Sequence, residues 1–589
     1  MSEPHPDATK FAENFAKIAE SSQKIIQEFI AKNSNGTSFN NGDVFHIGNA
    51  FAEWFARVLN DPKKIIDLQL GWWMDTLNLW QHTTQKFLGE NNAPLVSPDS
   101  KDKRFKDPAW EESVVFDFIK QSYLLTSRWL QQSVQQVDDM DPHNAHKIDF
   151  YTRQFVDAMS PSNFAITNPE VLKATLESGG ENIVRGLQNM LEDIERGKGG
   201  IQISMTDYEA FSVGKNIAIS KGKVVFQNEL MQLIQYNPLT EKVNKAPLLV
   251  IPPWINKYYI LDLQPENSYL RWLSEKGHTV FVISWVNPDE KLGKKGFDDY
   301  MLEGIIASLD AIEQATGEKE INAIGYCLGG TLLAMTISYL KAKNQEKRVK
   351  SATYLTTMID FSESGDLSVF IDEEQLTALE QKMSEKGYLE GSEMSNTFNM
   401  LRANDLIWSF VVNNYLLGKD PFPFDLLYWN SDSTRMPAKM HSFYLRNMYQ
   451  NNLLIKPGAI KIAGVPIDLE KLNTPSYLLS TREDHIAPWK STYAATQIYK
   501  GTIRFVLAAS GHIAGVINPP SKNKYSYWTS DKLPVSPDDW FSSAKEEKGS
   551  WWNDWQKWIE TQGSEKVPAR MPGDGKLKSI EDAPGSYVK

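Results

Sequence analysis

One cysteine lies in a sequence context that could make it a nucleophile. Residues 325–330 read Gly-Tyr-Cys-Leu-Gly-Gly, and Cys327 is the single cysteine among 589 residues. Glycine two positions before and after the reactive residue is the pattern of a nucleophile elbow, here with Cys in place of Ser. Small neighbours are needed because the nucleophile sits at a strained turn that the backbone approaches closely. A lone cysteine is commonly a small buried hydrophobe, but this context predicts that Cys327 is a nucleophile.

A cysteine nucleophile needs a general base and an acid that orients it. In an α/β-hydrolase these follow the nucleophile in the order acid, then His. Asp484 follows a strand-like run (475–480) and His512 follows the next one (503–509). We therefore expect Cys327 to attack an acyl carbon, His512 to shuttle the proton and Asp484 to fix the imidazole tautomer. His485 is the rival base, and Glu483 is the rival orienting acid.

The tetrahedral oxyanion formed in acyl transfer needs two hydrogen-bond donors. The first is expected to be the backbone N–H of Leu328, directly after the nucleophile, and the second should come from the loop after the strand-like run 247–253. Pro252 and Pro253 have no N–H to give, so the candidates are Trp254 and Ile255. We prefer Ile255 slightly. We expect no cofactor and no metal.

The elements around these residues predict an α/β catalytic domain. Strand-like runs at about 224–236, 247–253, 279–285, 321–326, 352–359, 475–480 and 503–509 alternate with helical ones. Such alternation is typical of a parallel sheet with right-handed crossovers. Between about 360 and 455 the alternation stops in a helical, aromatic stretch, which we interpret as a cap or lid insertion. The last residues, 572–589, resemble a surface tail.

The preceding residues predict a mostly helical domain. Helical spacing appears near residues 11–29, 51–59, 67–88, 110–138, 145–159 and 168–195. We therefore divide the chain into a helical N-terminal domain, 1–205, and an α/β-hydrolase domain, 206–589.

Two segments carry clustered tryptophans. Trp72, Trp73 and Trp80 lie in an N-terminal helix, and residues 549–559 place Trp551, Trp555, Trp558 and Ile559 on one helical face. We expect the C-terminal helix to pack on the sheet, with an exposed stripe that contacts an apolar partner as the alternative. For the N-terminal helix, packing and surface contact are equally plausible.

Composition excludes several classes of protein. Sixty-two Lys and Arg against 74 Asp and Glu give a net charge of −12, which argues against nucleic-acid binding. A single cysteine excludes an intrachain disulfide and a multi-Cys zinc site. The N-terminus, MSEPHPDATK, lacks a secretory signal, and the longest apolar run (246–255) is half the length of a membrane span. These features predict a cytoplasmic protein with no transmembrane segment.

Longer motifs resemble those of class I polyhydroxyalkanoate synthases of the α/β-hydrolase superfamily. They include the elbow at 325–330, PPWINKYYILDL at 252–263, REDH at 482–485 and SGHIAGVINPP at 510–520. DAMSPSNF at 157–164 and LESGGE at 176–181 extend the likeness to about 140–565, whereas residues 1–100 carry no recognised motif.

The resemblance implies polymerisation of (R)-3-hydroxyacyl-CoA, with 3-hydroxybutyryl-CoA as the expected monomer. It implies release of CoA, an acyl group carried on Cys327, His512 as base and Asp484 as third member, helping His512 to activate the 3-hydroxyl. It further implies a homodimer associated with the surface of polyester granules, with granule or partner contact and dimer support assigned to the N-terminal domain. The alternatives are a capped Cys-type thioesterase or lactone hydrolase, or a granule-coat scaffold with a vestigial elbow.

Overall fold

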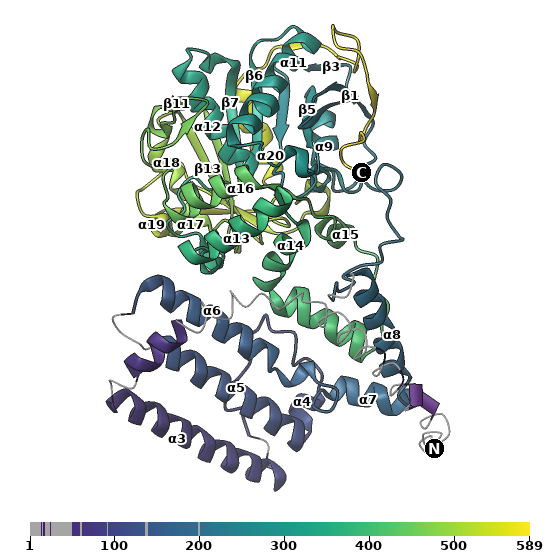
Figure 1. Ribbon diagram of the computed structural model, residues 1–589, viewed down its shortest axis with the longest axis vertical. Coiled ribbons are helices and arrows are strands. Elements are labelled where there is room, and N and C mark those ends of the chain that lie inside the picture. The colour runs from purple at the N-terminus through teal and green to yellow at the C-terminus, as the bar shows by residue number, and fades with distance from the viewer. Residues whose placement is uncertain are drawn as a thin grey trace. The chain divides into compact units, whose positions relative to one another are not determined.

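The chain forms two units, which are described here separately (Figure 1). The structure is a computed structural model that describes residues 50–58, 62–90, 92–135, 140–197 and 201–589, with a few residues between 13 and 24. One unit comprises Met1–Asp207 with Thr397–Phe422, and the other comprises Tyr208–Asn396 with Pro423–Lys589. The helix expected near residues 11–29 lies mostly outside the described residues.

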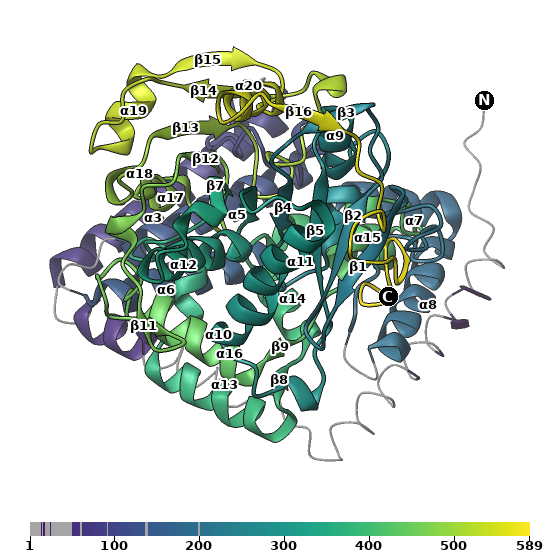
Figure 2. The ribbon, with the colours of Figure 1, turned by 90° about the horizontal axis from the view of Figure 1, so that it is seen from above.

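An eleven-stranded mixed sheet forms the centre of the second unit. Its strand order is β15-β14-β13-β12-β7-β6-β4-β5-β2-β1-β17, which Figure 2 displays from β15 to β1. The six strands from β13 to β5 are parallel, as expected for an α/β domain. The strands are β1 (Gly222–Gln227), β2 (Met231–Tyr236), β4 (Leu248–Ile251), β5 (Val280–Trp285), β6 (Ile321–Tyr326), β7 (Val349–Leu355), β12 (Ser476–Thr481), β13 (Ile503–Ala508), β14 (Ser526–Thr529), β15 (Lys545–Lys548) and β17 (Glu581–Asp582).

Both edges of the sheet are antiparallel, which the strand-helix alternation did not predict. At one edge β14 and β15 extend the sheet beyond β13. At the other edge β17 pairs with β1, so the C-terminal residues are not the surface tail that we expected. Val588 is buried, and the Tyr587 hydroxyl donates to the Asn228 carbonyl at 2.6 Å. The tail thus covers an edge whose backbone groups would otherwise be unpaired.

Helices cover both faces of the sheet, and the sheet separates two apolar clusters, one on each face. Side chains alternate along the strands: Leu249 and Ile251 join one apolar cluster, and Leu248 and Val250 join the other. Helices α11 and α12 contribute to the first cluster, and α9 and α20 contribute to the second. These helices are α9 (Tyr269–Glu275), α11 (Ala307–Thr316), α12 (Leu328–Ala342) and α20 (Trp552–Thr561).

The insertion expected at about 360–455 is helical but is divided between the units. It contains α13 (Glu373–Lys386), α14 (Gly391–Met400), α15 (Asp425–Ser431) and α16 (Ala438–Tyr444). Residues 397–422, however, belong with the N-terminal residues rather than with the catalytic unit. We call residues 397–422 the excursion. Nothing in the local sequence distinguishes this excursion from the rest of the insertion.

The first unit is built from helices, as expected. Gly179 and Gly180, both with positive φ, divide the single helix expected at 168–195 into two. The helices are α3 (Pro62–Phe87), α4 (Ala109–Glu112), α5 (Val114–Gln135), α6 (Pro142–Ala158), α7 (Pro169–Ser178) and α8 (Glu181–Arg196). No helix among the described residues is both long enough and apolar enough to traverse a bilayer.

Polar contacts hold residues 397–422 within the first unit. Tyr415 donates to the buried carboxylate of Asp193 at 2.6 Å, and the Asn182 side chain donates to the Leu416 carbonyl at 2.8 Å. A Cβ at Gly186 would lie 1.8 Å from the Tyr415 carbonyl oxygen, so only glycine permits this approach. Helix α8 therefore binds the excursion through specific hydrogen bonds and a close backbone contact.

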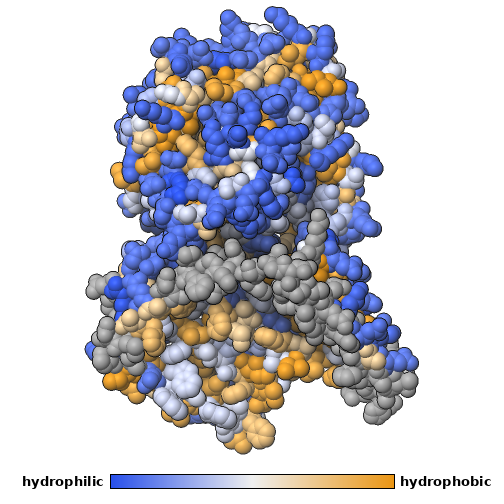
Figure 3. Space-filling view, viewed as in Figure 1, coloured by the Kyte–Doolittle hydropathy of each residue, from blue (hydrophilic) through white to orange (hydrophobic). Residues whose placement is uncertain are grey.

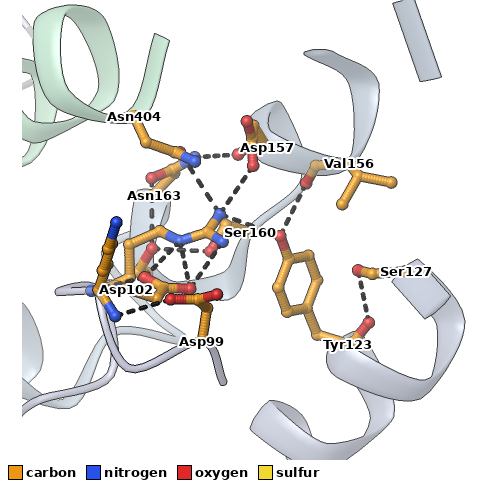
Figure 4. Close-up of polar contacts among 12 residues, drawn as sticks. Asp99, Asp102, Tyr123, Ser127, Val156, Asp157, Ser160, Asn163 and Asn404 are labelled. Atoms are coloured by element: carbon orange, nitrogen blue, oxygen red, sulfur yellow. Dashed lines mark hydrogen bonds and ion pairs between the residues drawn. The ribbon is translucent and has the colours of Figure 1, made fainter. Parts of the chain in front are cut away.

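Arg104 provides a second attachment for the excursion, and Figure 4 labels its partners Asp102, Tyr123, Asp157 and Asn404. Its guanidinium donates to Asp102, to the Tyr123 hydroxyl at 3.0 Å and to Asp157 at 3.1 Å. The same group reaches Asn404 of the excursion at 3.4 Å. Asp157 opens the motif at 157–164, so this motif helps to position the residue that contacts the excursion.

Candidate active site

Cys327 lies at the sharp turn between β6 and α12. Its φ of +52° and ψ of −122° are unusual for a side-chain-bearing residue, which is the strain expected of a nucleophile elbow. A Cβ at Gly325 would lie 2.4 Å from Cα of Gly330, and one at Gly329 would lie 2.2 Å from the Ile251 carbonyl oxygen. The glycine spacing is therefore a packing requirement of this turn.

The structure brings Asp484 and His512 together from the loops after β12 and β13. Nδ1 of His512 donates to Oδ2 of Asp484 at 2.7 Å, and both side chains are buried. The backbone N–H groups of Ile486 and Ala487 donate to the other carboxylate oxygen at 2.9 and 2.8 Å. The Thr481 hydroxyl donates to Oδ2 at 3.0 Å. The carboxylate is thus fixed from several sides and in turn orients the imidazole.

The electrostatics of His512 favour its charged form. Burial lowers the pKa of His512, but the charges of Asp484 and Cys327 and hydrogen bonds with both residues outweigh burial and raise that pKa to about 10. At neutral pH His512 is then an imidazolium beside the sulfur. An imidazolium in this position can supply a proton to a group that leaves the site.

The two rivals named from the sequence, Glu483 and His485, lie in environments that differ from those of Asp484 and His512. Glu483 is exposed, whereas the neighbouring Asp484 is buried against His512. His485 is half-buried, and its backbone carbonyl faces Gly365. Geometry therefore favours Asp484 over Glu483 as the residue that orients His512.

The expected oxyanion donors lie on two adjoining segments. Leu328 begins α12, where the first N–H groups have no intrahelical acceptor. Ile251 pairs with Gly325, so the loop after β4 starts beside the elbow. In that loop Trp254 is buried and Ile255 is half-buried, and both pack in the apolar cluster that Cys327 also contacts. These positions fit the expected donors, and the roles of Leu328 and Ile255 remain a prediction.

Aromatic residues near Cys327 were not found by sequence reasoning. Tyr444 and Tyr449 come from the insertion, their rings lie 5.3 Å apart, and both contact Phe361. Burial raises the pKa of both hydroxyls, and the proximity of Cys327 raises them further. Aromatic residues are frequent throughout the insertion, and no local spacing singles out these two.

A further group missed from the sequence holds the loop that carries His512. The indole N–H of Trp551 donates to the Gly515 carbonyl at 3.0 Å, and that of Trp552 donates to the Val516 carbonyl at 2.9 Å. Tyr326 donates to the His512 carbonyl at 3.2 Å, and its ring stacks on the imidazole.

The described residues contain no group of three or more His, Cys, Asp or Glu arranged to hold a metal ion.

Comparison with known proteins identifies the family. Residues 101–273 match the family described as the N-terminus of poly-beta-hydroxybutyrate polymerase (PhaC), and residues 247–519 match the alpha/beta hydrolase fold. The chain is 52% identical to a poly(3-hydroxyalkanoate) polymerase of Methylorubrum extorquens, over 90% of this chain and 88% of the relative. It is 47% identical to a poly(3-hydroxyalkanoate) polymerase subunit PhaC of Rhizobium meliloti, over 99% and 95% of the two chains.

A poly(3-hydroxyalkanoate) polymerase subunit PhaC of Cupriavidus necator is 44% identical to this chain, over 90% of it and 89% of the relative. The similarity therefore extends beyond the 140–565 range suggested by the motifs, into the first hundred residues. The chain belongs to the poly(3-hydroxyalkanoate) polymerase family and is an acyltransferase with that polymerase activity.

Proposed function

We propose that the chain polymerises (R)-3-hydroxyacyl-CoA, with 3-hydroxybutyryl-CoA as the preferred monomer, through an acyl group carried on Cys327. The observation that supports this most strongly is the pairing of an elbow cysteine with the buried Asp484–His512 pair, whose side chains lie 2.7 Å apart. No cofactor takes part in the proposed reaction, because thioester exchange requires only a nucleophile, a proton carrier and an oxyanion site.

Acylation begins when the Cys327 thiolate attacks the thioester carbonyl of the monomer. The carbonyl oxygen becomes an oxyanion, which the N–H groups of Leu328 and Ile255 stabilise. When the carbon–sulfur bond to CoA breaks, His512 supplies the proton to the departing thiolate. Because a thioester replaces a thioester, this step is nearly isoenergetic, and the acyl group remains activated.

Elongation consumes the activated acyl group. A 3-hydroxyl attacks the acyl-Cys327 carbonyl, His512 takes the hydroxyl proton, and the cysteine sulfur leaves as thiolate. Asp484 stabilises the imidazolium that forms and thereby helps to activate the hydroxyl. Ester formation from a thioester is downhill, so the chain grows provided that water is kept away. The buried side chains of Phe361 and Tyr444, with the half-buried Tyr449 packed on both, support the exclusion of water.

Matched variants test these roles. We expect Cys327→Ala to abolish CoA release from (R)-3-hydroxybutyryl-CoA, and Cys327→Ser to lose most of it. His512→Ala should remove acylation and elongation, whereas His485→Ala should leave acylation largely intact. Asp484→Asn should slow turnover by about 10⁴-fold, whereas Glu483→Gln should not. Free 3-hydroxybutyrate instead of insoluble polyester would indicate a hydrolase, and normal turnover of Cys327→Ala would contradict the assignment of the nucleophile.

The outer surface of α3 supports the proposed contact with polyester. Figure 3 shows hydrophobic side chains gathered over the unit that contains α3. Trp73, Leu77 and Trp80 are 58%, 64% and 59% exposed. An apolar face of this extent marks a contact surface, and a polyester granule is the apolar partner that the reaction itself produces. We infer a cytoplasmic enzyme bound to granules through α3 and acting as a homodimer, a state that sedimentation of the pure protein would test.

A further inference from the structure

A short segment of the insertion forms hydrogen bonds and an ion pair with the loop that follows β4. We call residues 429–434 the strap and residues 252–259 the β4 loop. The Thr434 hydroxyl donates to the carbonyl oxygens of both Trp254 and Ile255, each at 2.6 Å, and Thr434 is buried. One hydroxyl proton is therefore shared between the two consecutive carbonyls that flank the preferred oxyanion donor.

The rest of the strap contacts the following residues of the same loop. Ser433 forms a β-bridge with Asn256. Asp432 makes an ion pair with Lys257 at 2.7 Å and accepts a hydrogen bond from the Tyr259 hydroxyl at 2.8 Å. The Trp429 indole donates to the Lys257 carbonyl at 2.7 Å. Outside the strap, the Trp285 indole donates to the Pro252 carbonyl and the Trp254 indole donates to Met440. The strap thus supplies polar contacts both to the loop backbone and to the Lys257 and Tyr259 side chains.

The geometry of the peptide bond gives the Thr434 contacts a particular consequence. In a trans peptide the C=O of one residue and the N–H of the next point in opposite directions. When the Trp254 carbonyl is held towards Thr434, the Ile255 N–H must point away from Thr434. The loop begins beside the elbow, because Ile251 pairs with Gly325 and its carbonyl oxygen abuts Gly329. Thr434 thus sets the direction of the donor expected to receive the oxyanion.

We propose that Thr434 is a positioning residue that aims the Ile255 N–H at the oxyanion formed when Cys327 is acylated. This inference rests on the proposed function, since it requires Cys327 to be acylated by a thioester. Thr434 itself touches no reacting atom. It acts through the peptide between Trp254 and Ile255, and the Asp432 contacts hold the remainder of the loop in register.

The test separates acylation from simple access to the sulfur. Thr434→Val keeps the shape but removes the hydroxyl, and Thr434→Ser keeps the hydroxyl. We measure single-turnover CoA release from (R)-3-hydroxybutyryl-CoA, the rate at which iodoacetamide alkylates Cys327, and thermal melting. Alkylation forms no oxyanion, so a defect in the oxyanion site leaves it unchanged. Thr336→Val is the matched control, because Thr336 is buried and bonds the Leu332 carbonyl within α12.

We expect Thr434→Val to slow CoA release by about 10- to 100-fold, less than the 10²–10³ lost when an oxyanion donor is deleted. Alkylation should stay within about twofold of the wild-type rate, and Thr434→Ser and Thr336→Val should both release CoA normally. Wild-type CoA release by Thr434→Val would overturn the inference, and so would a parallel loss of alkylation. If wild-type protein itself releases no CoA, the proposed function fails instead.

A second variant covers the case in which Thr434→Val does not fold. Asp432→Asn preserves volume while weakening the contacts with Lys257 and Tyr259. We expect a severalfold loss of CoA release with unchanged alkylation. Unchanged CoA release by a folded Asp432→Asn protein would overturn the role assigned to the strap.

Discussion

Two tryptophan-rich helices, α3 and α20, have similar compositions and opposite environments. In α20 and at its start, Trp551, Trp552 and Trp555 are at most 1% exposed. In α3, by contrast, Trp73 and Trp80 are 58% and 59% exposed. Both helices place their indoles at helical spacing, so spacing alone does not decide whether an aromatic face is core or surface.

The difference comes from what each helix has to cover. The Trp555 indole reaches across the sheet face to donate to the Thr353 hydroxyl of β7 at 2.8 Å. Helix α3 instead attaches to α5 through its polar face, where His82 and Lys86 contact the buried Asp117 at 3.0 and 2.9 Å. The Trp80 ring also touches Phe118 of α5, with ring centroids 5.7 Å apart, but more than half of the Trp73 and Trp80 side chains stays exposed. The expected packing of α20 is thus confirmed. For α3 the exposed indoles favour surface contact over packing, and that contact stays a prediction.

The largest effect is expected from truncating the centre of the buried cluster. Trp555→Ala should destabilise the catalytic unit by about 3–5 kcal/mol, because it removes a fully buried ring and the donor to Thr353. Calorimetry should show a lower melting temperature. Lys557→Ala, on the exposed side of the same helix, should stay within about 0.5 kcal/mol of wild type. Equal melting of both variants would contradict the packing of α20.

A pH effect of nearly this size is expected from a histidine packed against α20. Nδ1 of His278 accepts a hydrogen bond from the Asn244 side-chain amide, Nε2 donates to the Gln556 side-chain oxygen, and the ring lies against that of Trp555. Burial lowers the pKa of His278 to about 4, although the bond to Gln556 opposes this. The unfolded chain takes up this proton near pH 6.5, so the contribution is complete above that pH. It is lost as the pH falls from about 6.5 to 4, at a cost of about 3 kcal/mol.

The difference between wild type and His278→Asn isolates this contribution from that of other groups, including the buried His441. Urea unfolding between pH 4 and 8 should give a shallower loss of stability at low pH for the variant. Parallel curves for the two proteins would show that His278 is not held neutral against α20.

Trp551→Phe should destabilise the protein less than Trp555→Ala does, but it should also slow turnover. A benzene ring replaces the indole, and the Gly515 carbonyl loses its donor. The lost hydrogen bond alone should cost about 1–2 kcal/mol. Because that loop carries His512, kcat should fall as well. Trp558→Phe is the matched control, since the Trp558 ring contacts Tyr477 rather than this loop. Equal kcat for the two variants would show that the indole does not position His512.

The smallest stability effect is expected on α3. Trp73→Ala should change the free energy of unfolding by less than about 0.5 kcal/mol, while shifting protein from granule to supernatant in a sedimentation assay. Leu79→Ala, on the buried side of the same helix, should instead cost about 2–5 kcal/mol. If Trp73→Ala melts early and partitions normally, the surface of α3 is core rather than a granule contact.

The sequence predicted the elements that position the chemistry because their signals are local. The run 321–326 is β6 as expected, and a helix, Leu328–Ala342, follows the elbow directly. The glycines around Cys327 follow from steric limits that any such turn must obey. Asp484 and His512 could be expected to meet because loops after neighbouring parallel strands lie at one edge of a sheet, and their side chains do meet.

Features that depend on distant pairing could not be predicted. The pairing of β17 with β1 joins residues more than 350 positions apart, and a two-residue strand has no pattern of its own. The excursion at 397–422 is defined by its receptor on α8 and not by its composition. Thr434 is an ordinary threonine in sequence, and only the fold brings its hydroxyl to the β4 loop.

The central claim is that Cys327 carries the growing acyl chain, and trapping that thioester tests it most directly. Wild-type protein is mixed with less than one equivalent of (R)-3-hydroxybutyryl-CoA, quenched in acid, digested and examined by mass spectrometry. We predict that the peptide containing Cys327 carries 3-hydroxybutyryl units that hydroxylamine removes, in proportion to the CoA released. CoA release without acyl groups on that peptide, or with acyl groups on another residue, would contradict the account.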